Sequence, residues 1–138
     1  MMKILLDTNI ILDSFWCDRP LHEEALSLFE EEQFGTLDIC ASSLSLKDVY
    51  YIGCKELDER LVRSFISGLL EVMKILPVDQ DTIQLAIKGD EADFEDGIVR
   101  ACAETAGVDF IITRDVEAFA NSTIKSIASD DFCKYVLK

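Results

Sequence analysis

Short apolar runs alternate with longer segments of helical periodicity along most of this chain. Five runs have the length and composition of strands: residues 3–6, 37–41, 74–78, 110–113 and 123–127. The intervening segments carry apolar residues three and four positions apart, which is typical of amphipathic helices. The first run is apolar after Lys3, as expected for a strand buried on both faces of a parallel sheet. The alternation therefore predicts right-handed βαβ units and an α/β fold with helices on both faces of the sheet.

Local signals place the expected helices. The segments read as helices are residues 10–16 with Thr8 and Asn9 as caps, a helix opened by Pro20, one from about Ser43 through Ile52, residues 57–71, one capped by Asp79, one capped by Asp93 and ended at Gly107, and a final helix from Asp130. Proline suits the first turn of a helix, and glycine suits its end.

The length of 138 residues predicts one compact domain, residues 1–138, with one core. No segment approaches the roughly 20 uninterrupted apolar residues that span a membrane. A charged residue also follows the first methionines too soon for a secretory signal. We therefore expect a cytoplasmic protein without a membrane span.

The composition excludes several classes of site. Five scattered cysteines with no C-x-x-C spacing make a disulfide framework or a zinc knuckle unexpected. The single histidine, His22, excludes a His-pair ribonuclease and a three-His zinc site, and a Ser–His–Asp triad would have to use this residue, which is expected on the exposed first turn of a helix. The formal net charge of −14 opposes general attraction to nucleic acid, although a local basic rim can coexist with it. The same charge fits metal binding or a basic protein partner.

Two aspartates follow predicted strands directly. Asp7 comes after the first strand, and Asp115 comes soon after the strand at 110–113. Parallel strands end at one edge of the sheet, and open α/β sheets bind ligands there. Carboxylates that lie close together repel each other, so such a group favours a divalent cation.

Asp48 and Asp96 are the other two acidic candidates. If a helix begins near Ser43, Asp48 faces the core side or a cleft; the alternative is an exposed acid paired with Lys47. Asp93 and Asp96 are three residues apart and share a helix face, so both can address one site while Asp93 also caps the helix.

Four neighbouring residues can support such a site. Thr8 or Asn9 can fix the loop after the first strand, Thr113 can hydrogen-bond a water or a phosphate, and Arg114 can contact a nucleic-acid backbone. A site with oxygen ligands alone suits Mg²⁺ or Mn²⁺ better than zinc.

Three segments in this order resemble PIN-domain (PilT N-terminus) proteins, a group that includes VapC-type toxins. They are residues 5–10 (L-L-D-T-N-I), 93–96 (D-F-E-D) and 111–115 (I-I-T-R-D), with Phe119 and Ser122 downstream. The likeness extends from residue 4 to Asp131 and Phe132.

The resemblance implies a three-layer α/β/α sandwich around a parallel sheet of four to five strands. It also implies Mg²⁺- or Mn²⁺-dependent cleavage of RNA, a cognate antitoxin as partner and a homodimer. By position, the four acidic residues of the family site match Asp7, Asp48, Asp96 and Asp115, with Asp7, Asp96 and Asp115 as metal ligands. Asn9 and Thr113 match the supporting polar positions.

The chain departs from the family pattern at two places. Asp48 stands where the family most often has Glu, and Asp115 and Ala118 stand where it often has Asn and Asp. Either Asp115 takes over the ligand role, or the site has one carboxylate fewer. The alternative function is therefore a weak or inactive PIN-like module that binds RNA or a protein partner. A response-receiver-like domain is a third alternative, but it requires paired acids after the first strand, where Asp7 stands alone.

Overall fold

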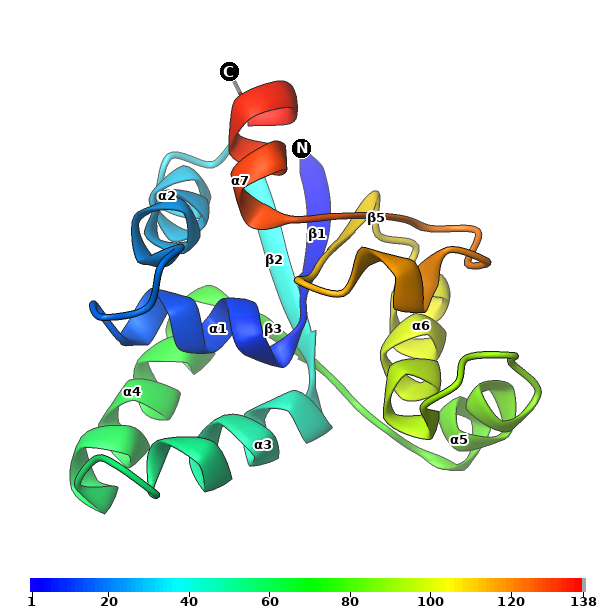
Figure 1. Cartoon of the computed structure of the whole chain (residues 1–138), viewed down its shortest axis with the longest axis horizontal. Helices are drawn as coiled ribbons and strands as arrows, with labels where there is room; N and C mark the ends of the chain where they lie inside the picture. Colours follow the sequence, from blue (N-terminus) through cyan, green and yellow to red (C-terminus); the bar gives the residue numbers. More distant parts are fainter. Residues whose placement is uncertain (138) are drawn as a thin grey trace.

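A five-stranded parallel sheet lies at the centre of the computed structural model, which describes residues 1–137 (Figure 1). The strand order is β3-β2-β1-β4-β5, so the first strand lies in the middle. The strands are β1 (Met2–Leu6), β2 (Leu37–Ser42), β3 (Lys74–Leu76), β4 (Phe110–Ile112) and β5 (Lys125–Ile127). All four pairings are parallel, as the sequence predicts.

Helices cover both faces of the sheet (Figure 1). The helices are α1 (Thr8–Phe15), α2 (His22–Gln33), α3 (Ser43–Gly53), α4 (Glu59–Val72), α5 (Gln80–Ile87), α6 (Phe94–Ala106) and α7 (Ser129–Phe132), with the 3₁₀ helix η1 (Val116–Phe119) and the π-helical turn η2 (Cys133–Leu137). The predicted three-layer α/β/α sandwich is confirmed.

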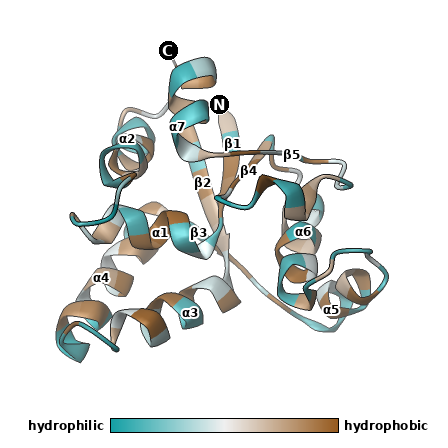
Figure 2. Cartoon of the chain, in the orientation of Figure 1, coloured by the Kyte–Doolittle hydropathy of each residue, from teal (hydrophilic) through white to brown (hydrophobic). Residues whose placement is uncertain are grey.

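The alternation of side chains along β1 builds a core on each face of the sheet. Ile4 and Leu6 pack with α1 to α4 and α7, whereas Leu5 packs with α5 and α6. All three are fully buried. A strand buried on both faces has no polar side to present, which explains the continuous apolar run. Figure 2 shows hydrophobic stretches on the central strands and on α1.

Two of the predicted helix starts are wrong. Helix α1 begins at Thr8, because Asp7 is the cap and its carboxylate accepts the N–H of Thr8 at 2.8 Å. Helix α2 begins at His22 rather than Pro20. The chain makes hydrogen-bonded turns first, with the N–H of His22 donating to the carbonyl of Arg19 at 3.1 Å.

Three predicted helix boundaries agree with the structure: the caps at the starts of α5 and α6, and the end of α6. Asp79 accepts the N–H of Thr82 at 3.0 Å, and Asp93 accepts the N–H of Glu95 at 2.9 Å. Gly107 ends α6 with a φ of 67°, a left-handed conformation that glycine adopts without strain.

The register of the sheet places the ends of β1 and β4 together. Leu6 pairs with Ile112, so Asp7 and Thr113 follow neighbouring strands at the same edge. The N–H of Asp7 continues this pairing by donating to the carbonyl of Ile112 at 3.0 Å. Within the described residues, no helix is long and apolar enough to cross a membrane.

Candidate functional site

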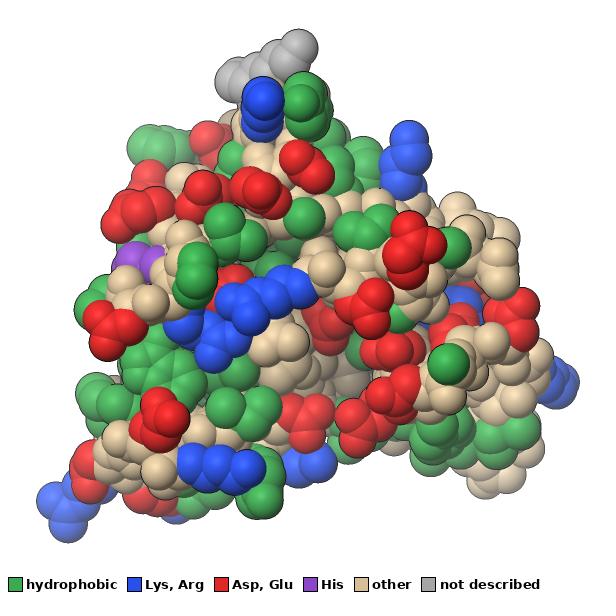
Figure 3. All heavy atoms as spheres, in the orientation of Figure 1, with side chains coloured by type: hydrophobic (Ala, Val, Ile, Leu, Met, Phe, Trp, Pro, Cys, Tyr) green, Lys and Arg blue, Asp and Glu red, His purple; other side chains and the backbone are tan. Residues whose placement is uncertain are grey.

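A cleft of about 500 Å³ opens at the carboxyl edge of the sheet. Its predicted lining residues are Asp7 after β1, Asn9 on α1, Asp48 on α3, Asp93 and Asp96 at the start of α6, and Asp115 after β4. In Figure 3, acidic side chains border the hollow in the middle of this face, and a group of Lys and Arg side chains lies beside it. The structure thus brings all four candidate acids to one cleft, while their roles stay predictions.

Asp7 is held by hydrogen bonds at both carboxylate oxygens. Oδ1 accepts the N–H of Thr8 at 2.8 Å, and Oδ2 accepts the hydroxyl of Thr113 at 2.9 Å. Burial raises the pKa of Asp7, the bonds from Thr8 and Thr113 lower it, and Asp115 and Asp48 raise it further; the balance is upward. A buried carboxylate with acidic neighbours is a group that a bound cation would stabilise.

Asp96 lies at the first turn of α6 and faces the same acidic group. Burial raises the pKa of its carboxyl to about 6, with smaller contributions from Asp93, Asp7 and Asp115. Asp7, Asp96 and Asp115 line the same cleft, so carboxylates far apart in sequence lie near each other here.

Asp48 combines both alternatives left open by the sequence. Its Oδ1 forms an ion pair with Nζ of Lys47 at 2.8 Å, and its side chain also lines the cleft. Asp48 is half-buried rather than exposed, so it pairs with Lys47 while its side chain faces the cleft.

Asp115 and Thr113 organise the loop after β4. The carboxylate of Asp115 accepts the N–H of Ala118 at 3.3 Å, and its own N–H donates to the hydroxyl of Thr113 at 3.1 Å. Asp115 is exposed, whereas Thr113 is buried behind Asp7 and does not line the cleft. Thr113 therefore connects the two acidic residues.

The donor set suits a hard divalent cation, because the cleft offers carboxylate and amide oxygens. As the side chains stand, no three Asp, Glu, His or Cys residues among positions 1–137 are close enough to hold a metal ion together.

A buried acid beside the cleft was not predicted from the sequence. Asp13 on α1 is 0% exposed, and its Oδ1 accepts a hydrogen bond from Arg19 at 2.7 Å and another from Arg114. Nη2 of Arg19 also donates to Asn9 at 3.1 Å, and a ring nitrogen of His22 lies 2.7 Å from the carbonyl oxygen of Asp13. A polar residue inside the apolar stretch of α1 is the one signal that could have indicated it. Arg114, which we expected to face nucleic acid, therefore also fastens the loop after β4 to α1.

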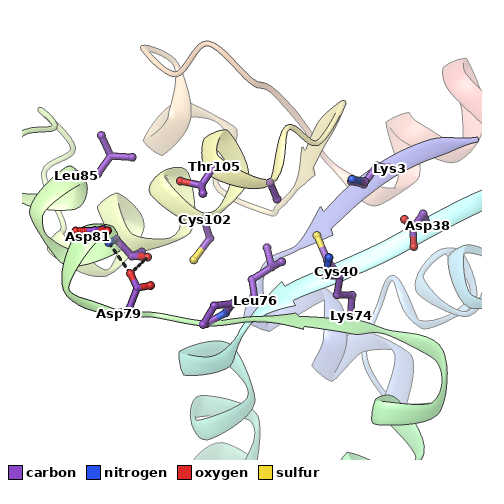
Figure 4. Close-up of a pocket in the computed structure, with 13 residues that line it drawn as sticks. Lys3, Asp38, Cys40, Lys74, Leu76, Asp79, Asp81, Leu85, Cys102 and Thr105 are labelled. Atoms are coloured by element: carbon purple, nitrogen blue, oxygen red, sulfur yellow. Dashed lines mark hydrogen bonds between the residues drawn. The ribbon is translucent and has the colours of Figure 1, made fainter.

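A separate cavity of about 420 Å³ lies between the sheet and the helices α5 and α6 (Figure 4). It shares no lining residue with the acidic cleft. Burial raises the pKa of the Cys40 thiol in it to about 12, so this cysteine is a poor nucleophile. Its lining combines two Lys, three Asp and two Thr residues with apolar residues and cysteines, an arrangement without a catalytic constellation.

Comparison with known proteins decides the family. A family model for the PIN domain matches residues 3–117. The chain belongs to the PIN-domain family. This membership confirms the resemblance and removes the response-receiver alternative.

Relatives of this PIN domain cover nearly its whole length. Ribonuclease VapC1 of Aquifex aeolicus is 26% identical over 137 residues, covering 96% of this chain and 94% of the relative. The structure of FitAB bound to an IR36 DNA fragment matches with a TM-score of 0.72 at 19% identity, covering 91% of this chain and 94% of that chain. VapC20 of Mycobacterium tuberculosis, described as a sarcin-ricin loop cleaving toxin, matches with a TM-score of 0.70 at 17% identity, covering 85% of this chain and 93% of that one. The two structures show the shared fold.

Proposed function

We propose that this PIN domain is an Mg²⁺- or Mn²⁺-dependent endoribonuclease, the toxin of a toxin–antitoxin pair. The observation that carries the proposal is the convergence of Asp7, Asp48, Asp96 and Asp115 on one cleft at the sheet edge. The relative named Ribonuclease VapC1, similar along nearly the whole chain, supports RNA as substrate.

Each residue of the cleft has a proposed role that follows from its position. Asp7, Asp96 and Asp115 would hold the ion, and Asp48 completes the acidic wall at α3. The ion, when bound, supplies an activated water at neutral pH and offsets negative charge on the phosphate. Thr8 and Thr113 fix the carboxylate of Asp7, so this ligand is preorganised before substrate arrives.

The partners follow from the same proposal. A toxin of this kind is expected to bind a cognate antitoxin protein, to form a homodimer and to act in the cytoplasm, where its RNA substrate is found. The relative described as a sarcin-ricin loop cleaving toxin supports the toxin assignment on which these expectations rest.

The deciding experiment measures cleavage of a 5′-labelled single-stranded RNA by the purified chain. We expect cleavage with Mg²⁺ or Mn²⁺, none with EDTA, and a loss of about 100-fold or more in Asp7→Asn, because positioned charges at such a site contribute about this much. Asp58→Asn, an exposed aspartate that precedes α4 and makes no side-chain capping bond, is the matched control. Undiminished cleavage by the Asp7→Asn protein would overturn the assignment.

The second candidate is a PIN domain that binds RNA or protein without cleaving it. The exposed position of Asp115 and the spacing of the carboxylates favour this candidate. It predicts no cleavage with either metal, and an affinity for RNA that Asp7→Asn and Asp96→Asn leave unchanged. The same labelled RNA, followed by fluorescence anisotropy, distinguishes the two functions.

A further inference from the structure

A second hollow, of about 430 Å³, opens beside the acidic cleft. We call it the basic pocket; its lining residues are Trp16, Asp18, Arg19, Pro20, Ile52, Lys55, Glu56 and Arg114. Ile52 lines both hollows, and Arg114 directly precedes Asp115 of the acidic cleft. A single-stranded RNA that lies in the acidic cleft can therefore continue into the basic pocket.

The two guanidinium groups of the basic pocket share one carboxylate. Arg19 and Arg114 both donate to Oδ1 of the fully buried Asp13. Two cations against one anion leave one positive charge at the floor of the pocket, and the other charged lining residues are Lys55, Asp18 and Glu56. The shared partner also fixes both guanidinium groups in place, which reduces the entropy lost when they bind an anion.

Aromatic rings accompany these cations. Cζ of Arg19 lies 5.9 Å from the centre of the Trp16 ring, and Nζ of Lys55 lies 4.4 Å from the centre of the Tyr51 ring. Tyr51 is 62% exposed and lines the acidic cleft. Aromatic faces combined with cations are typical of surfaces that bind single-stranded nucleic acid, because bases stack while phosphates pair with the charges.

The acids of the basic pocket do not cancel this arrangement. Asp18, Glu56 and Lys55 are all exposed, so these three side chains can reorient in solvent, whereas the two guanidinium groups are held in place. Arg19, in contrast, is fixed by the buried Asp13.

We infer that the basic pocket holds the RNA strand next to the acidic cleft, with phosphate on Arg114 and Lys55 and a base on Trp16. The inference rests on the proposed function and names the path of its substrate. The acidic cleft repels phosphate, so a strand that reaches it requires cations close by. In a chain of net charge −14, this gathering of three of the 13 Lys and Arg residues meets that requirement. The aromatic rings beside the cations favour RNA, because successive bases stack on such rings while the phosphates pair with the charges.

The test measures binding of a 5′-fluorescein, 12-nucleotide single-stranded RNA by anisotropy, in EDTA and in the Asp7→Asn background, at several KCl concentrations. We expect Lys55→Gln and Arg114→Gln each to weaken binding about three- to tenfold and to reduce the slope of log K against log salt by about 0.7 for each phosphate that is no longer neutralised. Trp16→Leu keeps apolar bulk, and should weaken binding about tenfold without changing the slope. Lys88→Gln, an exposed lysine after α5 outside both hollows, is the matched control.

Three results would overturn the inference. The first is an RNA affinity and a salt slope in Lys55→Gln and Trp16→Leu that equal those of the parent protein. Neither substitution removes Arg19 or Arg114 from Asp13, so these two variants keep the test valid if Arg114→Gln unfolds. The second is an equal loss in Lys88→Gln, which would indicate general charge. The third is competition by an oligo-glutamate peptide as strong as that by unlabelled RNA, which would assign the pocket to protein. Cleavage by the wild-type chain with Mn²⁺ is measured in parallel, so failure of the pocket and failure of the nuclease assignment are told apart.

Discussion

At the scale of single residues, the acidic cleft is electrostatically unfavourable without a cation. Asp7 keeps a raised pKa even though two hydrogen bonds favour its charged form, because burial outweighs them. The pKa of Asp96 is about 6, where an ordinary aspartate has 3.8. Proteins retain such carboxylates at functional sites, where a ligand offsets the charge.

Asp96→Asn should therefore change how stability depends on pH in the metal-free protein. The folded state holds the Asp96 proton more tightly than the unfolded state, so Asp96 makes the wild-type free energy of unfolding fall as pH rises from about 4 through 6. The substitution removes this contribution and should raise stability at pH 7 by about 1 kcal/mol, a value reduced for solvent screening. Urea unfolding in EDTA between pH 4.5 and 7.5 measures it. Identical differences between the two proteins at every pH would contradict the prediction, and Asp58→Asn serves as control.

At the scale of elements, a buried arginine fixes the helix that carries Asp96. Arg100 on α6 is 7% exposed and donates to Glu91 at 2.5 Å, to Glu104 at 2.9 Å and to the carbonyl of Leu85 on α5 at 2.9 Å. Glu104 in turn accepts the hydroxyl of Ser122 at 3.2 Å, before β5. One guanidinium thus joins α5, α6 and the segment leading into the edge strand.

Arg100→Ala should destabilise the fold by about 3–5 kcal/mol, because it leaves the buried Glu91 carboxylate without its partner. The double substitution Arg100→Met with Glu91→Leu should cost less than half of this, since it removes both charges and keeps the volume. Arg63→Ala, which breaks the exposed pair with Glu59 on α4, should change stability little. Chemical denaturation measures all three, and a double variant as unstable as Arg100→Ala would show that packing, not charge, is responsible.

The sequence predicts elements better than it predicts contacts between them. Asp7 and Asp115 could be assigned to one sheet edge, because apolar runs and helical spacing determine a parallel sheet and its ends. The pairing of Asp13 with Arg114 could not be predicted, since it depends on how a loop packs against α1 across 101 residues. Pro20 led to a wrong helix start for a local reason: its fixed φ fits a turn as well as a first helical turn.

At the scale of the whole molecule, 27 acidic against 13 basic residues give a net charge of −14. Acidic side chains border the central hollow (Figure 3), so part of the repulsion is concentrated where the cation is proposed to bind. Self-repulsion of this kind destabilises a compact state, and it is relieved either by general screening or by one bound ion. These two effects differ in their dependence on single carboxylates.

Mn²⁺ should therefore stabilise the whole fold through one site. At about 100 times the dissociation constant, a ligand that binds only the folded state adds about 2.7 kcal/mol, which for a domain of this size raises Tm by roughly 10 °C. Asp7→Asn and Asp96→Asn should lose most of this shift, whereas Asp58→Asn should keep it. Calorimetric scans with Mn²⁺ are compared with NaCl at equal ionic strength, because screening alone acts on every variant alike. Two results would contradict this prediction: an equal rise of Tm in NaCl, or an undiminished rise of Tm with Mn²⁺ in both cleft variants. Either result would mean that the cation interacts only with the diffuse negative charge of the surface and that the carboxylates at the sheet edge form no metal site.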